Sequence, residues 1–184
     1  KKFEVIIKER NEQITPKPKL TVMQGIPKYD RLKEAIELMV EAGADEIIPW
    51  SASRSISKWQ KDSRSKWESA AFASAKQAKR FSIPKIAEEV DIQEFLSSKS
   101  GSFAVIVLHE NGGIKLSKII SEKMADLDEI VLVIGPEGGI DESEMQLFKD
   151  SKAGFASLGK SILRTSSAGA ISAAILLAQT KWIK

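Results

Sequence analysis

The sequence contains no cysteine and a single histidine, His109. A chain without cysteine has no disulfide, no thiolate metal ligand and no cysteine nucleophile, and one histidine makes a histidine-rich metal site implausible. No apolar run approaches the roughly 18 residues that span a bilayer, and the start of the chain lacks the apolar core of a signal peptide. We therefore predict a cytoplasmic protein with no metal and no membrane association.

The composition is that of a soluble globular protein, because 42% of the 184 residues are hydrophobic and 29% are charged. This length supports one sizeable core with a fragment of a second unit. Residues 3–8 alternate like an edge strand, and residues 11–19 have the proline and charge content of a linker. The chain also begins with Lys1 rather than Met. These features predict a domain boundary near residues 17–19 and an upstream portion that is missing from this chain.

Basic residues are concentrated in one segment. Residues 54–85 carry nine lysines and arginines against two acidic residues, so this segment is +7 and the rest of the chain is −4. Such a concentration is the electrostatic footprint of a protein that binds a polyanion. A solvated, lysine-rich helix face is the alternative, and it stays open.

Short apolar runs rich in Val and Ile alternate with segments whose apolar residues recur at helical spacing. The runs predict strands at 20–26, 46–50, 103–108, 130–134 and 154–158. The spacing predicts helices at 30–41, 64–80, 115–125, 141–150 and 166–180. Strands that alternate with helices in this way form a parallel sheet with helices on both faces, so we predict an α/β fold.

Three of the predicted strands end in unusual loops, at residues 108–113, 134–139 and 158–169. In an open α/β sheet, ligands bind beyond the carboxyl ends of the strands, where such loops gather. In the second loop the glycines permit close backbone approach, and Asp141 with Glu144 can cap the following helix. The three loops together predict a pocket.

The second loop lacks both common nucleotide-binding patterns. No Gly-Lys-Ser/Thr follows the glycines, the Rossmann pattern of glycines is absent, and nearby carboxylates would repel a triphosphate. What remains is a loop that presents backbone amides and carbonyls to a neutral or cationic ligand, with Glu137 close by. A purely structural turn between strand and helix is the alternative.

Two motifs, IGPEGGIDESE at 134–144 and LGKSILRTSSA at 158–168, together resemble the signature pair of the RsmE family. Residues 24–59 and 74–80 are also similar to that family. Its members are ribosomal RNA uridine-N3 methyltransferases of the SPOUT superfamily. The resemblance implies a trefoil-knotted α/β domain over residues 19–184 that binds S-adenosylmethionine, forms a homodimer and methylates N3 of a uridine in small-subunit (16S) ribosomal RNA. It also implies an N-terminal PUA-like RNA-binding barrel, of which residues 1–18 would be a remnant.

The resemblance implies that residues at matching positions of all three loops form the cofactor pocket of the family. These positions are Leu108, His109, Gly135, Pro136, Glu137, Gly138, Leu158, Gly159, Ile162 and Leu163. Main-chain groups of these loops would bind the adenine, and apolar side chains would sandwich its ring. The sulfonium cation of the cofactor suits the carboxylate of Glu137. We expect His109 to be a pocket wall or a structural residue rather than a proton acceptor.

Arg164 is the candidate catalytic residue, because its fixed charge could orient a phosphate or stabilise a uracil oxyanion. A salt bridge at a dimer interface is the alternative for this residue. Positions that match the RNA face of the family are Lys28, Arg31, Arg54, Gln77 and Arg80. The chain departs from the family pattern at Ser166, where an acidic residue is common, and at 77–80, where QAKR replaces QSGR.

Three functions are compatible with these features. The first is the uridine-N3 methyltransferase of small-subunit ribosomal RNA. The second is another SPOUT methyltransferase, acting on RNA or protein. The third is a non-catalytic RNA-binding module that kept the fold.

Overall fold

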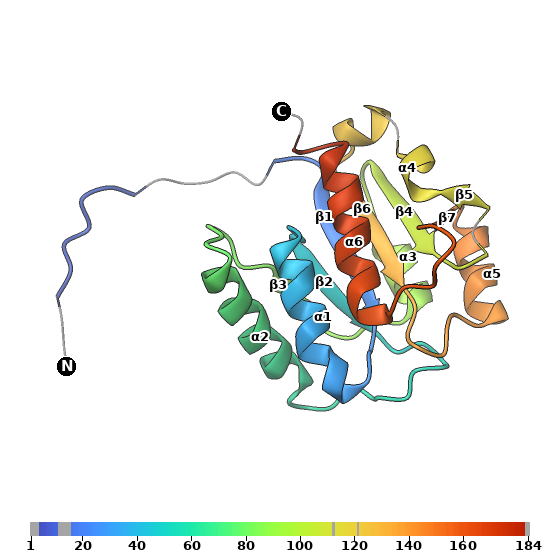
Figure 1. Ribbon diagram of the computed structural model, residues 1–184, viewed down its shortest axis with the longest axis horizontal. Coiled ribbons are helices and arrows are strands. Elements are labelled where there is room, and N and C mark those ends of the chain that lie inside the picture. Colours follow the sequence, from blue (N-terminus) through green and yellow to red (C-terminus); the bar gives the residue numbers. More distant parts are fainter. Residues whose placement is uncertain (1–3, 11–15, 112, 121, 183–184) are drawn as a thin grey trace.

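The computed structural model describes residues 4–10, 16–111, 113–120 and 122–182. It contains a seven-stranded sheet in the order β3-β2-β1-β6-β4-β7-β5, with helices packed against it (Figure 1). The strands are β1 (Lys19–Gly25), β2 (Glu46–Trp50), β3 (Lys85–Ile86), β4 (Phe103–Leu108), β5 (Ile114–Lys115), β6 (Glu129–Ile134) and β7 (Gly154–Ser157). The helices are α1 (Tyr29–Glu41), α2 (Ser63–Gln77), α3 (Ile92–Ser98), α4 (Leu116–Ile119), α5 (Glu142–Asp150) and α6 (Thr165–Ala178), with a 3-10 helix at Glu122–Asp126.

Every pair of neighbouring strands in this sheet is parallel, which confirms the predicted α/β class. Alternate residues of each strand point to opposite faces of the sheet. Val22 and Ile47 pack with α1 and α2 on one face, while Met23 and Ile48 pack with α3 and α5 on the other. Both faces of the sheet are therefore covered, as the Val- and Ile-rich strands predict.

Helix α6 lies beside α1 on one face of the sheet (Figure 1). The two helices approach closely at Gly169, where an added Cβ would lie 3.0 Å from the Met39 sulfur. Ala173, Leu176 and Leu177 bury the apolar side of α6 against the sheet. None of the helices in the described ranges is long and apolar enough to cross a membrane.

The structure differs from the sequence-based prediction at short elements. Residues 4–10 lie outside any strand, so the predicted edge strand at 3–8 is wrong for its described part. The helix predicted at 115–125 is divided into α4 and the 3-10 helix. Strands β3 and β5 have two residues each and depend on pairing with β2 and β7, so they leave no periodic pattern in the sequence.

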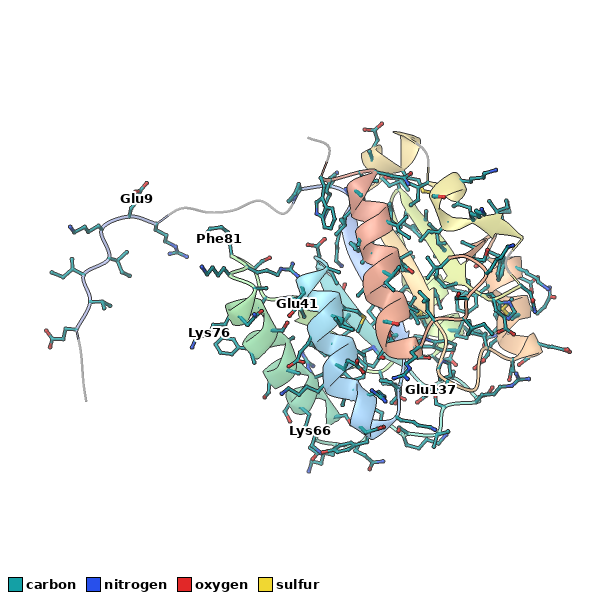
Figure 2. All side chains as sticks on the ribbon, in the orientation of Figure 1. Glu9, Glu41, Lys66, Lys76, Phe81 and Glu137 are labelled. Atoms are coloured by element: carbon teal, nitrogen blue, oxygen red, sulfur yellow. The ribbon has the colours of Figure 1, made fainter. Side chains whose placement is uncertain are left out.

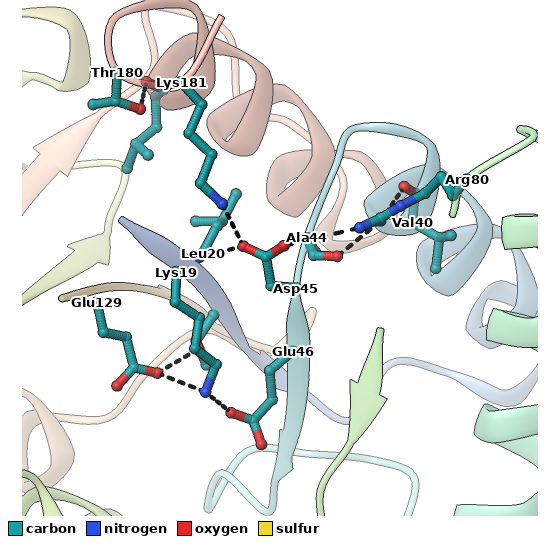
Figure 3. Close-up of polar contacts among 12 residues, drawn as sticks. Lys19, Leu20, Val40, Ala44, Asp45, Glu46, Arg80, Glu129, Thr180 and Lys181 are labelled. Carbon is teal, nitrogen blue, oxygen red and sulfur yellow. Dashed lines mark hydrogen bonds and ion pairs between the residues drawn. The ribbon is translucent and has the colours of Figure 1, made fainter. Parts of the chain in front are cut away.

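The amino ends of the strands are joined by buried and half-buried ion pairs (Figure 3). Lys19 lies between Glu46 and Glu129, and Lys85 pairs with Glu46 at 3.0 Å. Burial raises the pKa of Glu46, but hydrogen bonds from the two ammonium groups outweigh burial and hold that pKa below its ordinary value. The network thus links the amino ends of neighbouring strands. The long loops lie at the opposite, carboxyl edge of the sheet.

Candidate functional site

A cavity of about 690 Å³ lies at the carboxyl edge of the sheet, within the size range of small-molecule sites. The loops after β1, β2, β4 and β6, the first turn of α1 and the segment around the start of α6 form its wall. A smaller cavity of about 120 Å³ adjoins it, and residues 156–163, which comprise the end of β7 and the loop that follows, line most of it. The two cavities share Leu108, His109, Glu110, Ile162, Leu163 and Ala168. The three loops predicted to form a pocket therefore do meet.

The loop after β6 is held in place by backbone contacts. An added Cβ at Gly25, the last residue of β1, would lie 2.6 Å from the Pro136 nitrogen and 2.9 Å from the Gly135 carbonyl carbon. The Trp50 indole donates a hydrogen bond of 3.1 Å to the Ile134 carbonyl, and Thr165 Oγ1 donates one of 3.1 Å to the Gly135 carbonyl. The loop is consequently preorganised on three sides.

Helix α5 begins with the capping box predicted from the sequence. The Asp141 side chain accepts a hydrogen bond of 2.8 Å from the Glu144 backbone, and the Glu144 carboxylate accepts one of 2.9 Å from the Asp141 backbone. Hydrogen bonds from the Glu144 backbone and then from the Ser53 and Ser143 hydroxyls lower the pKa of Asp141 to about 2. The cap thus favours the ionised form of Asp141.

This pKa predicts acid sensitivity of the cap. A carboxyl whose folded pKa is lowered stabilises the fold above its unfolded pKa, and that contribution disappears as the pH falls through the folded value. The Asp141 contribution should therefore be complete above about pH 4 and decline toward pH 2. Denaturant unfolding at several pH values measures this effect. The unfolding free energy of Asp141→Asn should decline less steeply with falling pH than that of the wild type. Equal slopes would contradict the lowered pKa of Asp141.

His109 occupies the wall shared by the two cavities. Its backbone donates a hydrogen bond of 2.9 Å to the Ala156 carbonyl, and its Nδ1 accepts one of 3.1 Å from the Asn111 backbone. Because Nδ1 is the acceptor, Nε2 carries the proton of the neutral ring. His109 thus forms part of the cavity wall, and the expectation that it is not the proton acceptor stays a prediction.

Charged groups of both signs line the larger cavity. Glu137 accepts a hydrogen bond of 3.1 Å from the Lys28 backbone and lies below the lower end of α6, beside the lower end of α1, in Figure 2. Arg31 is 3.2 Å from Glu34. Arg164 also lines the cavity, and no carboxylate within the described residues lies within ion-pair distance of its side chain. Arg164 is exposed at the start of α6, so its charge is available to a ligand.

The structure brings together most of the site residues singled out from the sequence. Leu108, His109, Gly135, Pro136, Glu137, Gly138, Leu158, Gly159, Ile162 and Leu163 all line one or both cavities. The candidate catalytic Arg164 lies there too, and so do three of the five candidate RNA-binding residues: Lys28, Arg31 and Arg54.

Gln77 and Arg80 lie elsewhere. Gln77 is exposed at the end of α2. The Arg80 guanidinium donates hydrogen bonds of 2.7 Å to the Val40 carbonyl and 2.8 Å to the Ala44 carbonyl (Figure 3). Ala44 precedes β2, so Arg80 lies at the amino edge of the sheet, away from the cavities. Its half-buried side chain caps the end of α1, which is a structural role, and its contact with an RNA phosphate stays a prediction.

The basic segment at 54–85 is partly neutralised. Arg64 pairs with Glu68 and Glu88, Lys66 pairs with Asp62, and Lys85 pairs with Glu46. Lys66 and Lys76 lie at opposite ends of α2 (Figure 2). The segment therefore combines a solvated helix face, the alternative given above, with cations such as Arg54 that face the cavity.

Some cavity residues were not singled out from the sequence. Asp30, Glu110 and Thr165 line the larger cavity. Thr165 belongs to the second motif and directly follows Arg164, so the motif itself was the available signal. Asp30 lies in the first turn of α1 and Glu110 follows the end of β4, but nothing in their spacing distinguishes them from ordinary surface carboxylates.

A parallel α/β sheet whose glycine-rich loops enclose a cavity at the carboxyl edge defines a small-molecule-binding protein of the open-sheet class. The chain belongs to the RNA methyltransferase family, because the family model described as RNA methyltransferase domain matches residues 15–177. The resemblance to the RsmE family is thereby supported at the level of the whole domain.

Curated relatives agree with this family. A ribosomal RNA small subunit methyltransferase E from Mycobacterium bovis is 33% identical over 175 residues, covering 90% of this chain and 66% of the relative. The protein of the same name from Mesomycoplasma hyopneumoniae is 32% identical, covering 91% of this chain and 72% of the relative. The chain thus spans just under two thirds of the Mycobacterium protein. These names confirm the resemblance to RsmE.

Solved structures agree with the fold. Ribosomal RNA small subunit methyltransferase E from Neisseria gonorrhoeae, bound to S-adenosyl methionine, superposes with a TM-score of 0.81 at 25% identity, covering 89% of this chain and 67% of that one. A SpoU methyltransferase from Streptomyces viridochromogenes superposes with a TM-score of 0.60 at 12% identity, covering 90% and 62%. The second likeness shows the fold alone, and it agrees with the predicted α/β architecture.

Proposed function

We propose that this protein is an S-adenosylmethionine-dependent methyltransferase that acts on N3 of a uridine in small-subunit ribosomal RNA. The observation that carries the proposal is the pair of adjoining cavities at the carboxyl edge of the sheet, which the residues of both RsmE motifs line. The relative from Neisseria gonorrhoeae, which binds S-adenosyl methionine and shares this fold, supports the cofactor. The names of the curated relatives support ribosomal RNA as the substrate.

The residues of the three loops fit this cofactor. Backbone amides and carbonyls of the loops at 135–138 and 158–159 would hydrogen-bond the adenine, and Leu108, Ile162 and Leu163 would cover its faces. Glu137 supplies a carboxylate that suits a sulfonium cation. The bound cofactor would supply an activated methyl group, and the protein would position the nucleotide against it.

Arginines at the rim of the larger cavity suit an RNA substrate. Arg54 and Arg164 can each bind a phosphate or a uracil oxygen with two parallel hydrogen bonds. When N3 gives up its proton to solvent ahead of methyl transfer, negative charge develops on the uracil oxygens, and a guanidinium beside them would stabilise that charge. Arg164 is our candidate for this role because its side chain is not committed to a carboxylate of the described chain.

The proposal includes a homodimer, a trefoil knot and a cytoplasmic location, where ribosomal subunits are substrates. Exposed Ile171, 39% accessible on the small-residue helix α6, supports a contact between two copies. A dimer contact at α6 would lie close to Arg164, the N-cap residue of that helix. A salt bridge across the dimer is therefore the alternative role of Arg164.

Mapping of methylated nucleosides tests the proposal. The chain is incubated with small-subunit ribosomal RNA and S-adenosylmethionine, and the RNA is digested and analysed by mass spectrometry. We expect 3-methyluridine as the product. Methyl on ribose or on another base would favour a different SPOUT methyltransferase. Calorimetry that detects no cofactor binding to the folded protein would favour a non-catalytic RNA-binding module.

A further inference from the structure

We infer that Ser53 is a positioning residue that holds Arg54 at the RNA side of the cavity by binding the capping box of α5. The inference rests on the proposed function, because it assigns Arg54 to the RNA substrate. Ser53 itself does not line the cavity and acts through its neighbour.

Two hydrogen bonds join the loop after β2 to the start of α5. The Ser53 backbone donates one of 2.7 Å to Glu144 Oε1, and the Ser53 hydroxyl donates one of 2.5 Å to Asp141 Oδ2. Both acceptors are the carboxylates that form the capping box, so each already has a fixed orientation. Glu144 is also buried, with 8% of its surface exposed. The loop after β2 is therefore held by two hydrogen bonds to carboxylates whose positions are fixed.

The next residue, Arg54, packs directly on the glycine-rich loop. A Cβ added to Gly138 would lie 2.7 Å from the Arg54 carbonyl oxygen and 2.8 Å from the Arg54 Cβ. Only a glycine lets the two backbones approach so closely. Ala52 and Ser55, on either side, are buried, while the Arg54 side chain is exposed and lines the cavity. The backbone of Arg54, from which the side chain extends, is consequently held in place by the residues before and after it.

Fixing a long side chain before the ligand arrives lowers the ordering cost of binding. Loss of the Ser53 hydroxyl should leave the backbone hydrogen bond to Glu144 intact but loosen the loop. We expect Arg54 to reach the RNA less often as a result, while the cofactor loops and Arg164 remain in place. The effect should therefore appear in substrate binding rather than in the chemical step.

Ser143 offers a matched control. Its hydroxyl donates a hydrogen bond of 2.8 Å to Asp141 Oδ1, the other oxygen of the same carboxylate. Ser143 lies in the first turn of α5 and has no hydrogen bond to the loop of Arg54 among the described residues. Ser143→Ala thus weakens the cap to a similar degree without releasing that loop.

Steady-state methylation of small-subunit ribosomal RNA tests the inference with four variants: Ser53→Ala, Ser143→Ala, Arg54→Ala and the double variant Ser53→Ala/Arg54→Ala. We expect Ser53→Ala to raise KM for RNA by about fivefold and to leave kcat within about twofold, as for loss of one hydrogen bond. Ser143→Ala should match the wild type. In the Arg54→Ala background, Ser53→Ala should have no further effect, because the side chain that it positions is absent.

Equal effects of Ser53→Ala and Ser143→Ala would overturn the inference, since the cap alone would then explain both. A full Ser53→Ala effect in the Arg54→Ala background would overturn it as well. These outcomes differ from failure of the proposed function, in which the wild-type chain binds the cofactor and yields no methylated RNA; the positioning role would fall with it.

Discussion

Arg164→Ala should lower kcat by at least about 100-fold while the Kd for S-adenosylmethionine stays within about twofold of the wild-type value. The expected fall in kcat is that usually seen when one preorganised hydrogen-bond donor to a developing oxyanion is removed. The side chain of Arg164 lines the larger cavity and is exposed, whereas the cofactor-binding backbone lies in the neighbouring loops. Stopped-flow or radiolabel turnover gives kcat, and calorimetry gives the cofactor Kd.

Arg164→Lys separates charge from geometry in the same experiment. Lysine keeps the positive charge but cannot form two parallel hydrogen bonds, so we expect it to restore only part of the turnover. Thermal unfolding of both variants should match the wild type because the side chain has no described ion-pair partner. Parallel loss of turnover and cofactor affinity would show instead that Arg164 supports the structure of the site or of the dimer.

Gly25→Ala should lower both the stability of the fold and the affinity for the cofactor. The new methyl group would lie 2.6 Å from the Pro136 nitrogen and 2.8 Å from its Cδ, so the glycine-rich loop must move away from β1. Overpacking of this kind costs about 1–3 kcal/mol of unfolding free energy. A loop displaced from the cavity should weaken cofactor binding by about tenfold or more. Denaturant unfolding and calorimetry measure the two effects.

Gly113→Ala is the control for this substitution. Gly113 follows β4 and is exposed, and a Cβ added there has no neighbouring atom of the described chain within 4 Å. We expect unfolding and cofactor binding to be close to wild type. If Gly25→Ala behaves in the same way, the contact between β1 and the glycine-rich loop is not what positions the site.

Most of the fold follows from the sequence because each long element has a strong local pattern. The helix α1 shows buried Ala35, Ile36, Met39 and Val40 at helical spacing, and Gly43 ends it with a positive φ of 103°. Strands β3 and β5 could not be predicted, because two residues are too few to show an alternation of apolar and polar side chains. These strands form only by pairing with a neighbouring strand. The predicted strand at 3–8 failed for a related reason: its alternation is present, but the described residues 4–10 have no pairing partner.

The site residues likewise divide into those that the sequence could bring together and those that only the folded chain reveals. Loops that follow parallel strands must meet at one edge, so the sequence was sufficient to bring the residues of both RsmE motifs together. The position of Arg80 depends instead on where α2 ends relative to α1, which no local pattern encodes. The contact of Ser53 with Asp141 joins residues 88 positions apart and likewise appears only in the folded chain.

A crystal structure of the wild-type chain with S-adenosylmethionine tests the central claim most directly. We predict the adenosyl group between the loops at 108–110, 135–138 and 158–163, with the methyl group facing the part of the cavity that Arg164 lines. Density for the cofactor at any other surface, or cavities that stay empty at saturating cofactor, would contradict the account.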